Sequence, residues 1–425
     1  MSKQFQNPKG TRDVLPEEQH YWRRIESVFE RLADVYGYEK LTLPIFEETV
    51  LFQRGVGEGT DIVEKEMYTF EDKGGHSLTL RPEFTAGAVR AYVQNGMASR
   101  TNPVKLWSAG PAFRYERPQA GRYRQFTQFN AEAFGEIDPA LDFEIMSLAW
   151  QAYEELRFKN LGFQINSIGC PECRPGYLDR LKAYYKDRVH DICGDCRSRL
   201  DRNPLRLLDC KNPQCQPVIA SAPATTQHLC AECNEHFETL RGYLDDRKRP
   251  YMINPRLVRG LDYYTKTVFE VWAEGIGAQN AVCGGGRYDG LVEMLGGKPT
   301  PGIGFAAGLE RIVLTMQAQG VKPEPVPPPK VYLLPQSETG KRCAVGLLAD
   351  LRRSRIESLI GFGGRSFKAL MREANNRGVR IVLILGEDEV HQGICQVKDM
   401  ETGAQRSVPL ADAISSVRNI LDGKS

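Results

Sequence analysis

Four arginines lie within eleven residues between Arg114 and Arg124, in the stretch RYERPQAGRYR. Strand-like segments flank this stretch, so we expect the arginines on a hairpin loop. A guanidinium group pairs bidentately with phosphate, and a cluster of such groups can therefore hold a polyphosphate or a nucleic acid. A basic surface loop with no ligand is the alternative interpretation.

The segment after this loop carries polar and apolar side chains in alternation. If residues 126–134 form a strand, one face holds Gln128, Asn130 and Glu132, and the other holds Thr127, Phe129, Ala131 and Ala133. Side chains of a strand point alternately to its two faces. The apolar face is therefore expected on the core, and the polar face is a candidate floor for a ligand.

Cysteine is concentrated in one part of the chain. Eight of the eleven cysteines form four close pairs, which are Cys170/Cys173, Cys193/Cys196, Cys210/Cys215 and Cys230/Cys233. Two such pairs can supply the four thiolates of a tetrahedral structural zinc site. Two sites in sequence order would be, for example, Cys170/Cys173/Cys193/Cys196 and Cys210/Cys215/Cys230/Cys233. Buried, reduced cysteines without metal are the alternative, because the same region contains apolar helical runs that could fold alone.

Periodicity predicts the elements that must position these residues. Apolar residues at helical spacing predict an amphipathic helix over residues 17–36. Residues 104–114 and 126–134 are predicted as the two strands around the arginine loop, and residues 255–273 as a strand-rich segment. GIGFAAGLER at 302–311 matches the letters of a dinucleotide-binding fingerprint, but KPTP rather than a strand precedes it. We expect a glycine-rich start of a helix there instead.

Composition is that of an ordinary globular protein of several domains. The 425 residues include 56 basic and 54 acidic side chains, which gives a formal net charge of +2. Apolar stretches are far shorter than the ~20 residues of a membrane helix, and residues 1–18 hold no apolar signal core. We therefore expect a cytoplasmic protein without membrane association. Five prolines within residues 320–329 predict a semi-rigid linker, followed by an α/β domain.

Taken in order, the motifs resemble those of the histidyl-tRNA synthetases, a family of class II aminoacyl-tRNA synthetases. The resemblance rests on TLRPE at 79–83, GRYRQF at 121–126, LVRGLDYY at 257–264, GGGRYDGL at 284–291 and GFAAGLER at 304–311. Further along, GRSFKALMREANNRG, VLILGEDE and VKDMETG resemble that family's anticodon-binding domain. The resemblance extends over nearly the whole chain.

This resemblance implies an α+β class II synthetase core, an antiparallel sheet with flanking helices, with a helical insertion and a C-terminal α/β anticodon-binding domain. The implied domains are residues 1–169 (core with motifs 1 and 2), 170–253 (cysteine-rich insertion), 254–319 (core with the histidine-specific motifs and motif 3), 320–329 (linker) and 330–425 (anticodon-binding domain). A homodimer is also implied, with the helix at 17–36 and Pro44 near its two-fold axis.

The implied activity is that of a histidine–tRNA ligase. Such an enzyme uses ATP with Mg²⁺ to activate L-histidine to histidyl-adenylate, then transfers the histidyl group to the 3′ end of tRNA-His in protein synthesis. By resemblance, Arg114 and Arg259 are catalytic residues at the α-phosphate, and Arg114 and Arg311 bind ATP. Because adenylation joins two anions, fixed cations lower its barrier.

Histidine itself must be recognised through its imidazole. The resemblance assigns Glu132 and Tyr264 to the ring nitrogens, and it assigns the α-ammonium group to Glu83, Thr85 and Gln128. Tyr263 is a further candidate, although one of two neighbouring strand residues must face away and would then belong to the core.

Two regions are assigned to tRNA. Arg117 and Gln119 match loop positions that the family uses at the acceptor end. Residues 350–380 contain eight lysines and arginines against three acidic residues. A solvated helix surface explains such an excess, but within a domain that resembles an anticodon binder we favour a surface that contacts phosphates.

Three alternative interpretations explain fewer of these features. A synthetase-like regulatory subunit of the ATP phosphoribosyltransferase of histidine biosynthesis typically lacks the anticodon domain and the arginine of RGLDYY, and both are present here. A tRNA-sensing module without catalysis would not need Arg114, Arg259 and Arg311. A zinc-ribbon nucleic-acid binder would explain only the cysteines.

Overall fold

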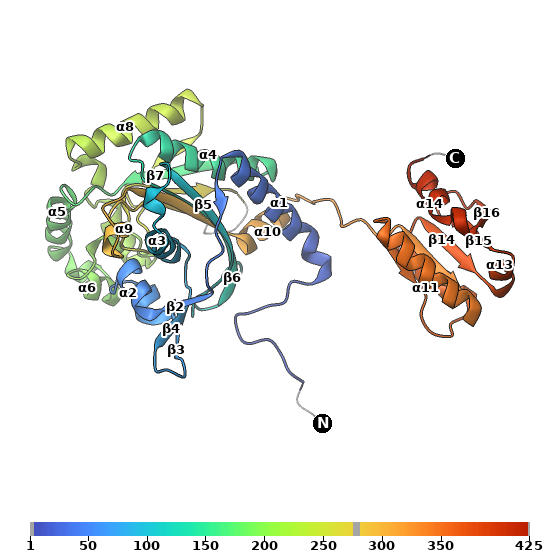
Figure 1. Ribbon diagram of the computed structural model, residues 1–425. Helices are drawn as coiled ribbons and strands as arrows, with labels where there is room; N and C mark the ends of the chain where they lie inside the picture. The colour runs from blue at the N-terminus through green and yellow to red at the C-terminus, as the bar shows by residue number, and fades with distance from the viewer. Residues whose placement is uncertain (1–3, 275–280, 424–425) are drawn as a thin grey trace. The chain divides into compact units, whose positions relative to one another are not determined.

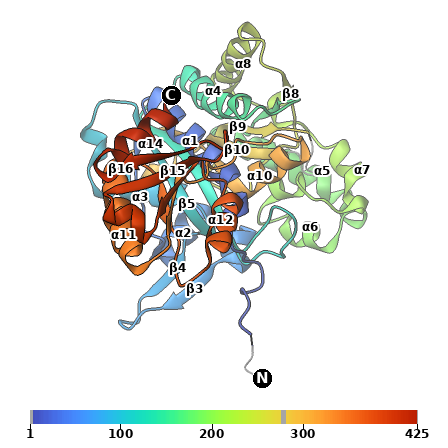
Figure 2. The ribbon, with the colours of Figure 1, turned by 90° about the vertical axis from the view of Figure 1, so that its right-hand side faces the viewer.

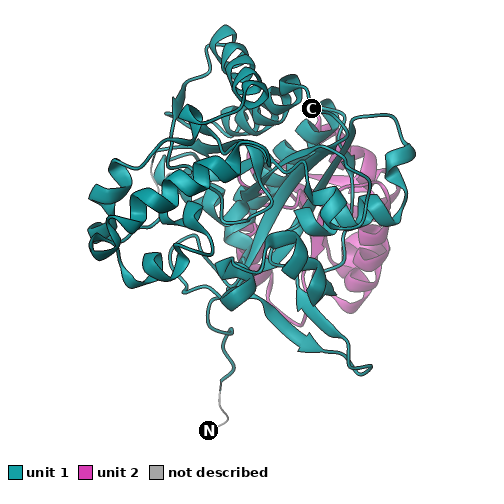
Figure 3. Cartoon of the chain, turned by 90° about the vertical axis from the view of Figure 1, so that its left-hand side faces the viewer, with its two compact units in different colours: residues 1–324 teal, residues 325–425 magenta. Residues whose placement is uncertain are grey.

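The computed structural model of the chain describes residues 4–274 and 281–423. The chain divides into two compact units, residues 1–324 and residues 325–425 (Figure 3). The division falls inside the Pro-rich segment 320–329, where successive prolines favour extended backbone. None of the described helices is both long enough and apolar enough to cross a membrane.

An eight-stranded sheet forms the centre of the first unit (Figure 1). Its strand order is β1-β5-β6-β11-β10-β9-β7-β8. Neighbours from β5 to β7 pair antiparallel, whereas β1 with β5 and β7 with β8 pair parallel. The strands are β1 (Glu39–Lys40), β5 (Val104–Phe113), β6 (Gln125–Phe134), β7 (Gly162–Ser167), β8 (Tyr251–Ile253), β9 (Thr265–Trp272), β10 (Ala281–Arg287) and β11 (Gly302–Gly308).

Strands β5 and β6 confirm the two strands predicted around the arginine loop. Strand β11 differs from the prediction, because GIGFAAG is a strand and helix α10 (Leu309–Ala318) begins only after it. Glycine is generally unfavourable in strands, so local preference does not indicate β11. Pairing with β6 and β10 on its two sides holds this segment extended.

Three helices cover one face of this sheet, namely α1 (Gln19–Val35, preceded by the 3₁₀ turn η1, Pro16–Glu18), α4 (Pro139–Glu155) and α10. Helix α1 lies within the predicted range 17–36. Apolar residues of these helices, such as Phe29 and Ile145, join one core with Phe129 of β6. The apolar face predicted for β6 is therefore confirmed as the face on the core.

The other face of the sheet meets helix α3 (Thr85–Gln94), whose Ala88 shares a core with Phe134 of β6. A small antiparallel sheet, ordered β2-β4-β3, lies beside it. The remaining elements of this region are β2 (Phe46–Glu48), β3 (Tyr68–Glu71), β4 (Ser77–Leu80), α2 (Thr49–Val56), α9 (Leu291–Met294), the π-helix η2 (Ile62–Glu66) and the 3₁₀ turn η3 (Met97–Ser99).

The cysteine-rich segment between β7 and β8 is helical, as predicted. Figure 2 shows α5, α6 and α7 together at one side of the unit, while α8 runs beside α4. The helices are α5 (Arg174–Lys186), α6 (Gly194–Arg199), α7 (Gln216–Ala220) and α8 (Ala231–Asp246), and the 3₁₀ turns are η4 (Val189–Asp191), η5 (Pro204–Leu207), η6 (Pro213–Cys215) and η7 (Thr225–Gln227).

The second unit is an α/β domain with the strand order β13-β12-β14-β15-β16. The first three of these strands pair parallel, which requires crossover connections such as helices. Its elements are β12 (Val331–Pro335), α11 (Glu338–Arg353), β13 (Ser358–Ile360), α12 (Phe367–Asn376), β14 (Ile381–Leu385), α13 (Glu387–His391), β15 (Ile394–Asp399), β16 (Gln405–Pro409), η8 (Leu410–Asp412) and α14 (Ala413–Leu421).

Candidate active site

The face of the large sheet opposite α1, α4 and α10 carries small residues at its centre and polar side chains at both sides. Residues directly opposite one another on paired strands share a face. Asn130 of β6 lies in one row with Gly284 of β10 and Glu270 of β9. Two residues along β6, Glu132 pairs with Gly304 of β11. The glycines leave space between the carboxylates, and we call this surface the polar face of the sheet.

Glu132 is held by two hydroxyl groups. Thr85 Oγ1 donates to Glu132 Oε1 at 2.7 Å, and Tyr288 Oη donates to Oε2 at 2.5 Å. The carboxyl group is buried, and burial raises the pKa of Glu132 to about 8, although the two hydrogen bonds oppose that rise. A neutral, buried carboxyl group can donate one hydrogen bond to a ligand, or accept one from it.

Sequence analysis did not single out Tyr288 as a site residue. The available signal was its place in the motif GGGRYDGL, directly after Arg287 at the end of β10.

Glu83 lies at the N-terminus of α3 and is also buried. Its carboxylate accepts from the backbone N–H groups of Thr85 at 2.6 Å and Ala86 at 2.9 Å. Burial raises the pKa of Glu83 despite these bonds. Gln128 adds an amide oxygen that is buried and has no hydrogen-bond partner among the described residues. Glu83 and Gln128 therefore offer oxygen acceptors for a cationic group.

Both tyrosines of RGLDYY are buried, and their ring centroids lie 4.7 Å apart. The strand predicted over 255–273 begins only with β9 at Thr265, so residues 257–264 do not alternate between two faces. Strand alternation, from which one ring was expected to face away, therefore does not apply to this pair. Tyr263 packs against the Tyr288 ring with centroids 5.7 Å apart, and the Tyr264 ring lies 5.9 Å from the Arg259 guanidinium.

Arg259 lies above the glycines of β10. Its Nη1 donates to Glu270 Oε1 at 2.5 Å, and a Cβ on Gly284 would lie only 2.5 Å from Nη1. Burial by itself would lower the pKa of Arg259. Its interactions with Glu270 and Tyr264 raise the pKa by more, so the pKa of Arg259 lies above its ordinary value. Glycine at 284 is thus needed for the guanidinium to lie here.

Glu270 was not identified from the sequence. It is the single acidic residue in TKTVFEVW, and a carboxylate in an otherwise largely apolar strand is the signal that could have indicated it.

The other two predicted arginines are anchored through backbone carbonyl groups. Arg114 Nε donates to the Pro82 carbonyl at 2.9 Å, and Arg311 Nε donates to the Ala281 carbonyl at 2.9 Å. Arg114 interacts electrostatically with Glu83, and Arg311 with Glu270. Both arginines therefore belong to the same charged site as the two carboxylates.

Arg117 and Gln119 lie elsewhere. Both are exposed on the loop between β5 and β6, where the Gln119 N–H donates to the Arg122 carbonyl at 3.2 Å. They are accessible to a large partner rather than part of the polar face.

The structure groups the cysteines differently from the order-based prediction. Cys170, Cys173, Cys230 and Cys233 form one set, called the root set here, and Cys193, Cys196, Cys210 and Cys215 form a second, the outer set. In each set the sulfur atoms lie within 4.8 Å of one another. The predicted grouping of successive pairs is wrong because the segment returns to its starting point, so its first and last pairs meet.

Three comparisons place these features among known proteins. A family model described as histidyl-tRNA synthetase matches residues 10–171 and 205–312, and one described as anticodon binding domain matches residues 330–420. The histidine–tRNA ligase of Dehalococcoides mccartyi (strain ATCC BAA-2266 / KCTC 15142 / 195) is 49% identical over 414 residues, covering 97% of this chain and 99% of its own. That of Desulforamulus reducens is 50% identical over 411 residues, covering 97% and 98%.

A solved structure, apo S. aureus histidyl-tRNA synthetase, is 35% identical to this chain with a TM-score of 0.82. The structural match covers 98% of this chain and 100% of the S. aureus chain. The family model spans more than half of the chain, and relatives of about half identity extend over almost all of it. This chain therefore belongs to the histidyl-tRNA synthetase family of class II aminoacyl-tRNA synthetases.

Proposed function

We propose that this chain joins L-histidine to tRNA-His in two steps. ATP first activates histidine to histidyl-adenylate, and the histidyl group then passes to the 3′ end of the tRNA. The observation that carries this proposal is that buried Glu132 and the Arg259–Glu270 pair share one sheet face, so that acceptors for a cationic amino acid lie beside cations for phosphate. Membership of the histidyl-tRNA synthetase family supports it.

In the amino-acid pocket, Glu132 accepts an imidazole N–H and Tyr264 contacts the other ring nitrogen. Glu83, Thr85 and Gln128 receive the α-ammonium group, and Tyr263 packs behind them. The burial of Glu83 and Glu132 makes such a pocket selective, because a ligand without matching groups would leave buried polar atoms unpaired. Sites of this kind discriminate by ~10⁴-fold or more.

For adenylation, Arg114 and Arg259 face the α-phosphate and Arg311 supports the nucleotide. Guanidinium groups held in place by Pro82, Glu270 and Ala281 need no reorganisation when negative charge develops on the oxygens of the α-phosphate, which is the main advantage of a preorganised site. Mg²⁺ bound with ATP would supply Lewis-acid stabilisation of the phosphate oxygens. Carboxylate oxygens suit Mg²⁺, and Glu270 is the carboxylate beside Arg259. Its two oxygens already accept from Arg259 Nη1 and Trp272 Nε1, so the ATP phosphates would supply most of the ligands of the ion.

For tRNA, we assign Arg117 and Gln119 to the acceptor end and residues 330–425 to the anticodon. The match of residues 330–420 to an anticodon binding domain supports the second assignment. The exposure of Arg117 and Gln119 on the loop between β5 and β6 supports the first.

We also propose that the protein is a cytoplasmic homodimer. Residues 170–253 are proposed to form an insertion between the two parts of the core. The surface near Pro44 supports a dimer, because Ile45, Phe46 and Val50 are exposed apolar residues there. Exposed apolar groups that cluster are typical of a protein–protein contact.

Each cysteine set is proposed to hold one structural zinc ion. Zn–S bonds of about 2.3 Å in a tetrahedron place the sulfur atoms about 3.8 Å apart. Sulfur–sulfur distances agree with this, at 3.8 Å for Cys170–Cys173 and Cys193–Cys210 and 3.9 Å for Cys196–Cys215. Four thiolates would leave no open position on the ion, so the role is structural.

ATP–pyrophosphate exchange measured separately with each of the twenty amino acids tests the proposed function. Exchange that depends on histidine is expected. Exchange with a different amino acid, or none in folded protein, would contradict the proposal.

A further inference from the structure

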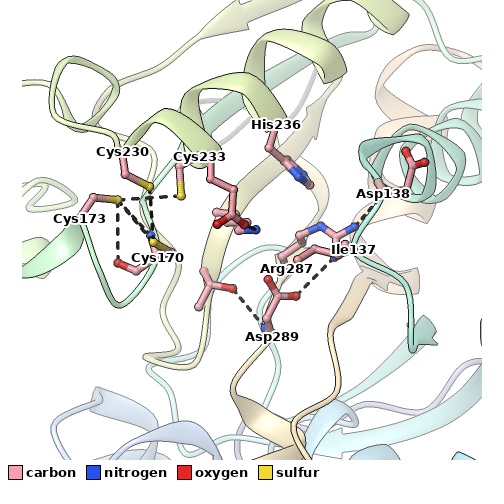
Figure 4. Close-up of polar contacts among 12 residues, drawn as sticks. Ile137, Asp138, Cys170, Cys173, Cys230, Cys233, His236, Arg287 and Asp289 are labelled. Atoms are coloured by element: carbon pink, nitrogen blue, oxygen red, sulfur yellow. Dashed lines mark hydrogen bonds and ion pairs between the residues drawn. The ribbon is translucent and has the colours of Figure 1, made fainter.

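The root set lies where the insertion leaves and rejoins the catalytic core. Cys170 follows the end of β7 at Ser167, and Cys230 immediately precedes α8. Figure 4 shows Cys230 and Cys233 at the start of α8 facing Cys170 and Cys173. The Cys170–Cys230 and Cys173–Cys233 sulfur distances are 3.8 Å and 3.9 Å, so the contacts join the two ends of the segment.

One connection leads from the root set to the loop that carries Tyr264. Arg174 directly follows Cys173, and its Nη2 donates to the Tyr264 carbonyl at 2.5 Å. The same guanidinium donates to the carbonyls of Ile168 and Gly169, both at 3.1 Å. The backbone of Tyr264 is therefore tied to the residues that lead into Cys170.

The backbone of Lys266, two residues after Tyr264, is also bonded to the residues that lead into Cys170. The Lys266 N–H donates to the Gly169 carbonyl at 2.9 Å, and the Ile168 N–H donates to the Lys266 carbonyl at 2.9 Å. Lys266 has φ of +46°, a left-handed conformation that a non-glycine residue adopts only when its surroundings hold it. Its buried ammonium group pairs with Glu232 of α8 at 2.6 Å.

A second connection runs along α8 to the opposite wall of the pocket. His236 Nε2 lies 3.0 Å from Asp142 Oδ1, and Asp142 Oδ2 pairs with Arg287 at 2.6 Å. All three side chains are buried, and Figure 4 shows His236 directed toward Arg287. Arg287 precedes Tyr288, whose hydroxyl donates to Glu132.

We propose that the root set is a zinc site that positions the histidine pocket. Metal coordination fixes Arg174 and the first turn of α8, and these hold the Tyr264 backbone on one side and the Arg287–Tyr288 segment on the other. The inference rests on the proposed function, because Tyr264 and Glu132 are taken there to bind histidine. The region beside the outer set also contacts the RGLDYY loop, because Asn203 Nδ2 donates to Asp262 Oδ1 at 2.7 Å. Among the described residues, however, it makes no hydrogen bond to Tyr264 or to the Arg287–Tyr288 segment, and its Arg199 pairs with Asp61 at 2.7 Å.

The test compares ligand substitutions at Cys230, a half-buried position. Zinc per chain is measured by elemental analysis, and the dissociation constants of histidine and ATP by calorimetry. We expect two zinc ions in the unaltered protein and one in Cys230→Ser, with histidine binding weakened about tenfold, the usual size of coupling between two sites. ATP binding should change less than about twofold. Cys230→His, which restores a Cys₃His ligand set, should recover both zinc and histidine affinity.

Arg174→Lys separates positioning from metal binding. It keeps the charge but loses the forked donor, so we expect two zinc ions and histidine binding weakened about tenfold. Arg180→Lys on the exposed side of the same helix is the matched control. Cys210→Ser should lose one zinc with a smaller effect on histidine than Cys230→Ser.

Several outcomes would overturn the inference. These are an unaltered protein without zinc, Cys230→Ser that loses zinc but binds histidine normally, and Cys230→His that holds two zinc ions but binds as weakly as the serine variant. An unaltered protein that does not bind histidine at all would instead overturn the proposed function, and the inference with it.

Discussion

Gly304 of β11 is paired with Glu132 on the neighbouring strand β6, and the Glu132 carboxylate fills the space in which a Cβ of residue 304 would lie. A side chain at 304 must therefore displace Glu132 from Thr85 and Tyr288. On this face, β11 contributes no side chain at position 304. The Glu132 side chain of the neighbouring strand β6 occupies that space instead.

Gly304→Ala is therefore expected to impair histidine binding. The added methyl group moves the Glu132 carboxylate out of its two hydrogen bonds, and we expect about a tenfold or larger rise in KM for histidine, which matches the cost of leaving a buried polar group unpaired. Gly308→Ala is the control on the same strand, because a Cβ there meets no atom within 4 Å. Equal KM values for both variants would refute this account of Gly304.

Glu132→Gln preserves the shape of the side chain and removes its titration. We expect KM for histidine to rise by about 10²-fold while KM for ATP changes little, because only the amino acid contacts this group. Steady-state exchange kinetics with each substrate varied in turn measure the split. A parallel rise of both KM values would contradict the assignment of Glu132 to the imidazole.

Stability should fall as pH rises from about 4.5 to about 8. The pKa of Glu132 is raised from 4.5 to about 8, and that of Glu310 to about 7, in both cases mainly by burial. Within this window the folded protein keeps protons that the unfolded chain releases, so the free energy of unfolding decreases with pH and levels off above the folded pKa. Denaturant unfolding across pH should show a shallower decrease in Glu132→Gln than in the unaltered protein.

Arg259→Ala should slow adenylate formation by ~10²-fold or more with a smaller effect on ATP binding. A cation aimed at the α-phosphate acts mainly on the transition state. Arg259→Lys should also be slow, because a point charge does not reproduce the guanidinium fork. Arg256→Ala, which alters an exposed arginine of the same segment, is the control. A single-turnover rate near that of the unaltered protein would rule out this role for Arg259.

Deletion of residues 330–425 should leave histidine activation detectable and weaken tRNA charging. All the proposed catalytic residues lie in the unit of residues 1–324, which has its own core. Pyrophosphate exchange and charging are measured on truncated protein shown to be folded. Charging equal to that of the full chain would show that the second unit does not contribute to tRNA recognition.

The polar face of β6 was predictable because strand alternation is a local property. Gln128 and Glu132 are four residues apart, so they share a face whatever the rest of the chain does. The segments around them were less predictable. Residues 257–264 contain the aromatic residues typical of a strand but lie outside β9, and both tyrosines are buried, with the Tyr263 ring packed against the rings of Tyr264 and Tyr288.

The alternation of β6, the four cysteine pairs and the family can all be recognised in the sequence, since each depends on residue types at short spacing or on ordered motifs. Three features appear only in the folded chain, namely that the first cysteine pair meets the last, that Gly304 makes room for Glu132, and that Glu270 pairs with Arg259. Each of these contacts joins residues that belong to different elements of the fold. They depend on register and on the return of the insertion to its origin, which no local pattern specifies.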